Sequence, residues 1–76
     1  MVYELRKWYD DSDCLYTDDQ RVKDLAIRSP DVQIVGTYFR TGREIRPFAW
    51  DIVGRRAALE NLTRTFTPRA GQRSVR

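Results

Sequence analysis

The chain of 76 residues is long enough for one small domain, and 41% of its residues are hydrophobic. It has no histidine and a single cysteine, Cys14, which excludes an internal disulfide and a cysteine-based zinc site and leaves out the commonest general base of enzymes. No apolar run approaches the roughly 20 residues that cross a membrane, and the N-terminal sequence MVYELRKWYD lacks the apolar region of a signal peptide. We therefore expect a cytoplasmic protein without a membrane partner.

The first third of the chain predicts one strand and one helix. Apolar and polar side chains alternate along residues 2–9, as in a half-buried strand. Residues 10–13, DDSD, are short polar side chains that favour a turn. Thr17 and Gln20 have the spacing of a capping box, which predicts the start of a helix, and Pro30 marks its end.

Residues 31–53 predict a β-hairpin, because β-branched and aromatic side chains lie on both sides of a central glycine, Gly42. A two-residue loop, Thr41 and Gly42, matches the tight turns that most often join hairpin strands. Pro47 lacks the backbone N–H of a regular ladder, so the second strand of the hairpin is expected at a sheet edge or at a bulge.

The two-residue loop fixes a register in which Tyr38 lies opposite Ile45, Ile34 opposite Ala49, and Arg40 opposite Arg43. A three-residue loop with a bulge would shift the pairing by one and mix the two faces, so we prefer the first register, which separates the apolar residues better. One face of the hairpin then carries almost only apolar side chains: Val32, Ile34, Gly36, Tyr38, Ile45, Pro47 and Ala49. The other face mixes polar, aromatic and basic side chains: Gln33, Val35, Thr37, Phe39, Glu44, Arg46, Phe48 and Trp50. We expect the first face in the core and the second face open.

Residues 55–66 predict a second helix, with apolar side chains at helical spacing and arginines facing outward. Residues 67–76 hold three arginines and no acid, and they predict a disordered basic tail. The fold class is therefore α+β: one domain of residues 1–66 in the order β-α-β-β-α, with a three-stranded sheet and two helices packed on one face.

Charge is distributed unevenly along the chain. Residues 1–31 hold eight acidic and five basic side chains, a net charge of −3, whereas residues 32–76 hold three acidic side chains and nine arginines, a net charge of +6. Such asymmetry indicates an anionic partner for the basic half, although a dipolar, solvated surface explains it equally well. Arginine in place of lysine suits phosphate or carboxylate recognition.

Aromatic side chains on an open sheet can stack on bases while arginines neutralise phosphates. This combination predicts a small, non-enzymatic nucleic-acid-binding module without a cofactor or a metal. The candidate binding residues are Phe39, Arg40, Arg43, Arg46, Phe48, Trp50, Arg55, Arg56 and Arg64. The alternative is a protein-interaction or dimerisation module that uses the same face, or an edge strand, to bind an acidic protein surface or a second copy of the chain.

Overall fold

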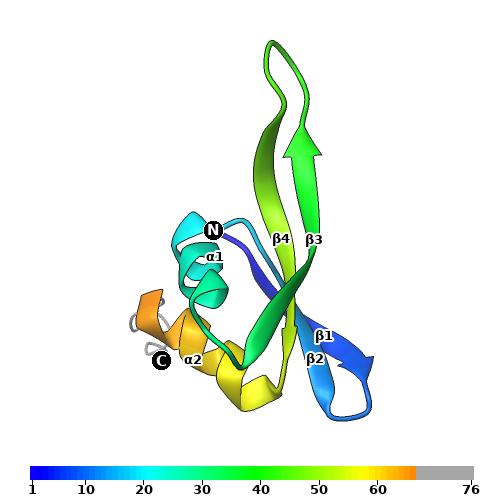
Figure 1. Cartoon of the computed structure of the whole chain (residues 1–76), viewed down its shortest axis with the longest axis vertical. Helices are drawn as coiled ribbons and strands as arrows, with labels where there is room; N and C mark the ends of the chain where they lie inside the picture. The colour runs from blue at the N-terminus through cyan, green and yellow to red at the C-terminus, as the bar shows by residue number, and fades with distance from the viewer. Residues whose placement is uncertain (67–76) are drawn as a thin grey trace, which may run out of the picture.

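Six elements follow one another in the order ββαββα. A computed structural model describes residues 1–66, and the predicted basic tail of residues 67–76 lies outside this range. The elements are β1 (Tyr3–Tyr9), β2 (Ser12–Thr17), α1 (Gln20–Ile27), β3 (Val32–Arg40), β4 (Arg46–Gly54) and α2 (Arg56–Phe66) (Figure 1). None of the described helices is long and apolar enough to cross a membrane.

The strands form one antiparallel four-stranded sheet in the order β1-β2-β4-β3. Each hairpin, β1–β2 and β3–β4, is followed by one helix, so the chain consists of two ββα units. The units meet where β2 pairs with β4, with Leu15 opposite Ile52. The α+β class is confirmed, but the prediction of three strands in the order β-α-β-β-α is wrong, because it omits β2.

β2 begins at Ser12, inside the stretch that the sequence predicts as a turn. The turn itself is shorter and includes Asp10, whose φ is 21°. Asp13 can therefore take part in the strand, where its buried carboxylate forms an ion pair with Arg56, with 2.8 Å between Asp13 Oδ2 and Arg56 Nε. A polar residue in a strand is thus stabilised by a helix far along the chain, which local propensity does not reveal.

The N-cap of α1 is Asp19, and the predicted capping box at Thr17 is wrong. Thr17 is the last residue of β2, and its hydroxyl accepts the backbone N–H of Asp19 at 3.1 Å. The Asp19 carboxylate accepts the backbone N–H of Arg21 at 3.0 Å, as N-cap carboxylates do. It also accepts the hydroxyl of Tyr3, so the cap ties the edge strand β1 to α1.

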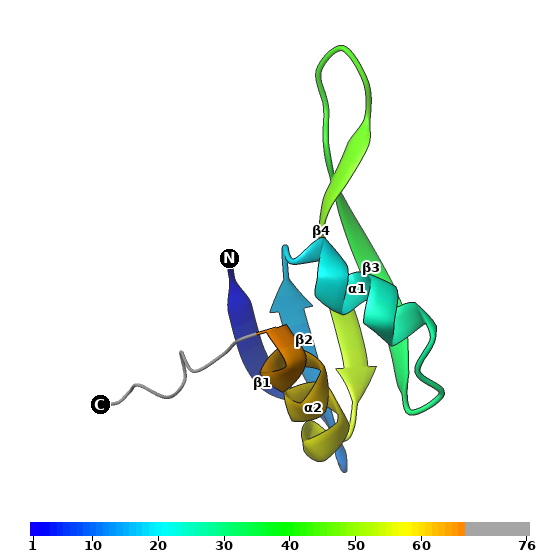
Figure 2. The ribbon, with the colours of Figure 1, turned by 90° about the vertical axis from the view of Figure 1, so that its left-hand side faces the viewer.

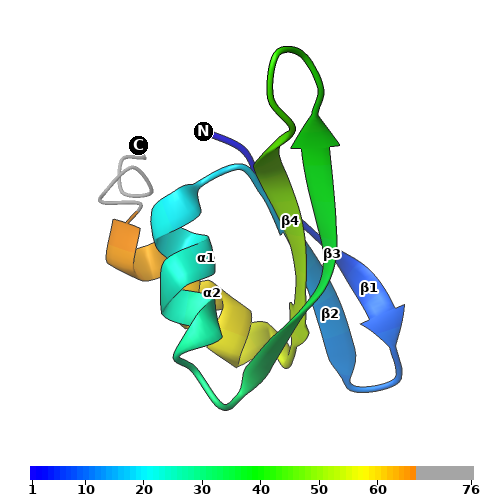
Figure 3. The ribbon, with the colours of Figure 1, turned by 45° about the horizontal axis from the view of Figure 1, so that its top comes forward.

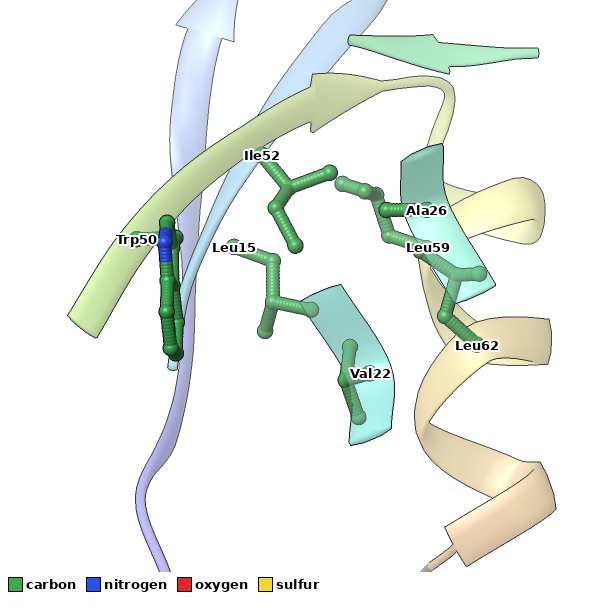
Figure 4. Packing of buried hydrophobic residues seen from close by; sticks show 7 residues of the cluster. All are labelled: Leu15, Val22, Ala26, Trp50, Ile52, Leu59 and Leu62. Carbon is green, nitrogen blue, oxygen red and sulfur yellow. The ribbon is translucent and has the colours of Figure 1, made fainter. Parts of the chain in front are cut away.

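Both helices pack on one face of the sheet, as predicted, and the opposite face carries no helix (Figures 2 and 3). We call this second surface the open face. Val22 and Ala26 of α1 and Leu59 and Leu62 of α2 are directed at the sheet, because they recur at helical spacing. With these four, the core contains Leu15, Trp50 and Ile52 (Figure 4).

The β3–β4 hairpin forms within residues 31–53, but its loop is longer than predicted. The strands end at Arg40 and resume at Arg46, so residues 41–45 form the loop in place of Thr41 and Gly42 alone. Arg40 consequently lies opposite Arg46 and not opposite Arg43. A loop of this length has room for exposed polar side chains and leaves the register to be set by the strands themselves.

Two bulges change the register of the hairpin. The ladder shifts between Ile34 and Gly36 and again between Tyr38 and Phe39. Tyr38 therefore lies opposite Ala49, and Ile34 opposite Ile52, whereas the sequence predicted Ile45 and Ala49 as their partners. Each extra residue in a strand moves the following side chains to the other face, so the predicted division into a core face and an open face is wrong.

Beyond the body of the sheet, β3 and β4 continue as a two-stranded extension (Figure 1). β2 pairs with β4 only along residues 50–54, so the preceding part of β4 has β3 as its only neighbour. Pro47 lies in this part, where the missing N–H disturbs no second ladder. The predicted edge position therefore holds for Pro47, although β4 is an inner strand farther on. We call residues 37–49 the ribbon.

Candidate nucleic-acid interface

The nine predicted residues lie in three separate places. The ribbon carries five of them: Phe39, Arg40, Arg43, Arg46 and Phe48. The core holds Trp50, and the start and surface of α2 hold Arg55, Arg56 and Arg64. The structure therefore brings about half of the predicted site together.

The end of the ribbon gathers three exposed arginines. Arg40 and Arg46 are direct cross-strand neighbours, and Arg43 lies in the loop between them. The only acid in the loop, Glu44, accepts Arg46 Nε at 3.0 Å. A hollow of about 380 Å³ lies at this end, and its lining consists of Arg40, Thr41, Gly42, Arg43, Glu44 and Arg46. Like charges directly opposite each other destabilise a ribbon, so an anion that binds between these arginines would stabilise it.

The arginines of α2 lie apart from the ribbon. α2 covers the helix side of the sheet at the end away from the ribbon loop (Figures 1 and 2). Arg56 is paired with Asp13, and Arg64 donates to the side chain of Asn61 at 2.8 Å. A ligand that binds on the open face would therefore not reach the arginines of α2.

Trp50 is not available to stack on a ligand. Only 5% of its surface is exposed, and it packs in the core with Leu15 and Ile52 (Figure 4). Lys23 of α1 lies over its ring, 5.3 Å from the centroid. The predicted exposure of Trp50 is wrong because the longer loop and the two bulges, one on β3 and one on β4, change the register of the hairpin. Trp50 lies on the same face of β4 as the buried Ile52.

The open face carries a row of three aromatic rings, of which the sequence assigned only Phe48 to a site. Tyr16 of β2 and Tyr38 of β3 have ring centroids 5.3 Å apart at an interplanar angle of 82°. Phe48 of β4 continues the row, 6.5 Å from Tyr38. We call these three residues the aromatic row. Tyr38 was predicted in the core, yet 40% of it is exposed.

Small side chains lie under the aromatic row. Successive residues of a strand point to opposite faces, so Cys14 and Ala49 point to the open face next to Leu15 and Trp50, which point to the core. Cys14 and Ala49 are nevertheless 0% exposed, because larger open-face side chains cover them. The open face is therefore an ordered layer of rings over small residues.

Asp51 holds the row in place from below. It is only 8% exposed, and its Oδ2 accepts the Tyr38 hydroxyl at 2.7 Å. This hydrogen bond raises the pKa of Tyr38. Gly36 makes room for the carboxylate, since a Cβ on that residue would lie 3.3 Å from Oδ2. Arg6 of β1 lies 3.6 Å from Oδ1, which has no hydrogen-bond partner among the described residues.

The neighbourhood of Asp51 also bears on Cys14. Burial raises the pKa of the Cys14 thiol, and the negative charge of Asp51 raises it further. Reactive cysteines need the opposite, an accessible thiol with a lowered pKa. Within residues 1–66, no three histidine, cysteine, aspartate or glutamate side chains are grouped so that they could hold a metal ion.

No protein-family model matches the chain, and neither the curated proteins nor the solved structures contain a significant match.

Proposed function

We propose that the chain is a non-enzymatic nucleic-acid-binding module and that the end of the ribbon contacts phosphates. The observation that supports the proposal is the pair of arginines, Arg40 and Arg46, directly opposite each other, with Arg43 in the loop between. Within the fold Arg46 is paired with Glu44, and Arg40 lies over the Phe48 ring. A phosphate between the guanidinium groups would accept further hydrogen bonds from planar forks that fit its oxygens.

The shape of the ribbon supports the same proposal. The ribbon extends beyond the rest of the domain, so its arginines can approach a polyanion without collision between the ligand and the helices (Figures 1 and 3). Its residues 40–47 are all exposed. Phosphate contacts of this kind dominate the affinity of proteins for nucleic acids and position the ligand without reading its sequence.

The experiment compares two triple variants of equal charge. Arg40→Ala/Arg43→Ala/Arg46→Ala removes the cations of the ribbon. Arg28→Ala/Arg55→Ala/Arg64→Ala removes three exposed cations elsewhere, and both variants lower the formal net charge from +3 to 0. Binding of fluorescent oligonucleotides, single- and double-stranded, is measured by anisotropy over a range of salt concentrations.

We expect the unchanged protein to bind with an affinity that falls steeply with salt. The ribbon variant should lower the slope of log affinity against log salt by about 2–3, since each phosphate neutralised contributes about 0.7–0.9. The variant Arg28→Ala/Arg55→Ala/Arg64→Ala should keep most of the slope. An equal loss in both variants would place the contact outside the ribbon. The absence of binding to any oligonucleotide at low salt would overturn the proposal.

Protein binding is the second candidate, and the position of β3 favours it. β3 is an edge strand of the sheet, and its outer side has no neighbour among the described residues. Val35 and Phe39 on this strand are 45% and 55% exposed. An exposed edge strand can pair with another protein or with a second copy. Light scattering of the unchanged protein tests this role, because a dimer would form without any oligonucleotide.

A further inference from the structure

We infer that the nucleic-acid ligand is single-stranded and that its unpaired bases stack on the aromatic row of Tyr16, Tyr38 and Phe48. The inference rests on the proposed function, and it adds the class of ligand and a second surface that contacts it. The ribbon end would hold the phosphates, and the open face would hold the bases.

The first step is accessibility. Both helices lie on the opposite face of the sheet, so no described helix covers the open face (Figures 2 and 3). On the open face itself, the Arg40 guanidinium lies over the Phe48 ring, and a base would stack on Phe48 after this side chain moves aside. Tyr38 is 40% exposed, and Tyr16 and Phe48 are half-buried. Folding removes only part of the surface of these rings from water, and a base that stacks on them would bury more of it.

The second step is order. The Tyr38 ring is fixed at three points: by the hydroxyl bond to Asp51 at 2.7 Å, by the edge contact with Tyr16, and by the tilted contact with Phe48. A ring that is already held in one position loses little conformational entropy when a base binds. Asp51 is therefore a positioning residue, which acts through Tyr38.

The third step is continuity with the ribbon end. The guanidinium carbon of Arg40 lies over the Phe48 ring, 4.7 Å from its centroid. The arginines at the end of the ribbon therefore lie directly beside the aromatic row. Arg6 offsets the charge of Asp51 beneath the row, so this carboxylate repels a phosphate backbone less than a free one would.

The fourth step excludes a regular duplex as the ligand of this face. The faces of paired bases are covered by their neighbours in the stack, so a duplex can offer only groove edges and phosphates to a protein. The aromatic row could not stack on such a ligand. Unpaired bases expose their faces, and aromatic side chains bind them with little dependence on sequence.

The test measures single-stranded and duplex oligonucleotides of equal length against Tyr38→Ala and Phe48→Ala. Tyr9→Ala is the matched control, because Tyr9 is an exposed aromatic residue at the β1–β2 turn. Each row variant should weaken single-strand binding by roughly 5- to 150-fold, the range for loss of one stacked base. The salt slope should stay unchanged, and duplex binding should change little.

A second measurement uses the unchanged protein, so it does not depend on the folding of a variant. A single strand that contains 5-bromouracil is cross-linked by light, and the modified residues are identified by mass spectrometry. We expect cross-links at Tyr16, Tyr38 or Phe48. Cross-links that fall only on the helix side of the sheet would overturn the inference.

The possible failures are distinguishable. If duplex and single strand bind equally and the row variants have no effect, the inference about the ligand is wrong and the ribbon proposal stands. If no oligonucleotide binds at low salt, the proposed function is wrong and this inference is wrong with it.

Discussion

The charge of Asp19 makes a contribution to stability that a single substitution can isolate. Hydrogen bonds from the Arg21 guanidinium and from Tyr3 lower the pKa of Asp19 from an ordinary 3.8 to about 2, although burial of the carboxylate opposes the shift. The Asp19 side chain is 0% exposed and the Arg21 side chain is 55% exposed, so solvent screens the ion pair only from the side of Arg21. The difference between the two pKa values corresponds to about 2 kcal/mol of folding free energy at neutral pH.

The perturbation is Asp19→Asn, which keeps a good N-cap side chain and removes the charge. We expect the free energy of unfolding at pH 7 to fall by about 2 kcal/mol, or the melting temperature by about 8–16 °C in a domain of this size. The control is Asp18→Asn. Asp18 is exposed and accepts only the backbone N–H of Val2 at 2.8 Å, so its loss should change stability by less than about 0.5 kcal/mol.

The pH dependence follows from the sign of the shift. A lowered pKa in the folded state stabilises the protein fully above pH 3.8, and this stabilisation is lost as pH falls toward about 2. Urea unfolding at several pH values should show the unchanged protein and Asp19→Asn converging near pH 2. Equal losses for Asp18→Asn and Asp19→Asn, or curves that remain parallel down to pH 2, would refute the reasoning.

Two further predictions concern the open face and the end of β4. Tyr38→Phe removes the hydrogen bond from the hydroxyl to Asp51 Oδ2 and should lower the free energy of unfolding in urea by about 1–3 kcal/mol; no change would mean that water replaces the hydroxyl. Gly54→Ala would place a Cβ 2.9 Å from a backbone carbonyl oxygen, whereas a Cβ at Gly42 meets nothing within 4 Å. Gly54→Ala should therefore cost about 1–3 kcal/mol and Gly42→Ala almost nothing, as thermal melts would show; equal melting temperatures would contradict this packing.

The sequence predicted those features that depend on local pattern. Both helices follow from apolar side chains at helical spacing, and the second helix, predicted as residues 55–66, is observed as α2 (Arg56–Phe66). The hairpin within residues 31–53 follows from its β-branched and aromatic composition. The placement of both helices on one face follows from the single apolar side of each.

The features that the sequence did not predict depend on contacts between distant residues. The start of β2 falls in the stretch DDSD, whose short polar side chains predict a turn, and Thr17 at its end predicts a helix cap. The pairing of Asp13 with Arg56 is visible only in the folded chain. The bulge of β3 leaves no local signal except Gly36, whose missing side chain makes room for Asp51. The bulge of β4 follows Pro47, at which the sequence predicted a sheet edge or a bulge. The error in register exchanged the roles of Trp50 and Tyr38, so that Trp50 lies in the core and Tyr38 on the open face.

The pairing of β2 with β4 has a consequence for the chain during its synthesis. β2 emerges from the ribosome before residues 50–54 do, so for that time its inner edge has no partner strand. Leu15 also lacks most of its core contacts at that stage, because its neighbours on β4 and α2 are made later. During synthesis this edge is open to other chains, in particular to β2 strands of neighbouring copies on the same messenger. The acidic residues around it, concentrated in the first 31 positions, keep such copies apart by mutual repulsion.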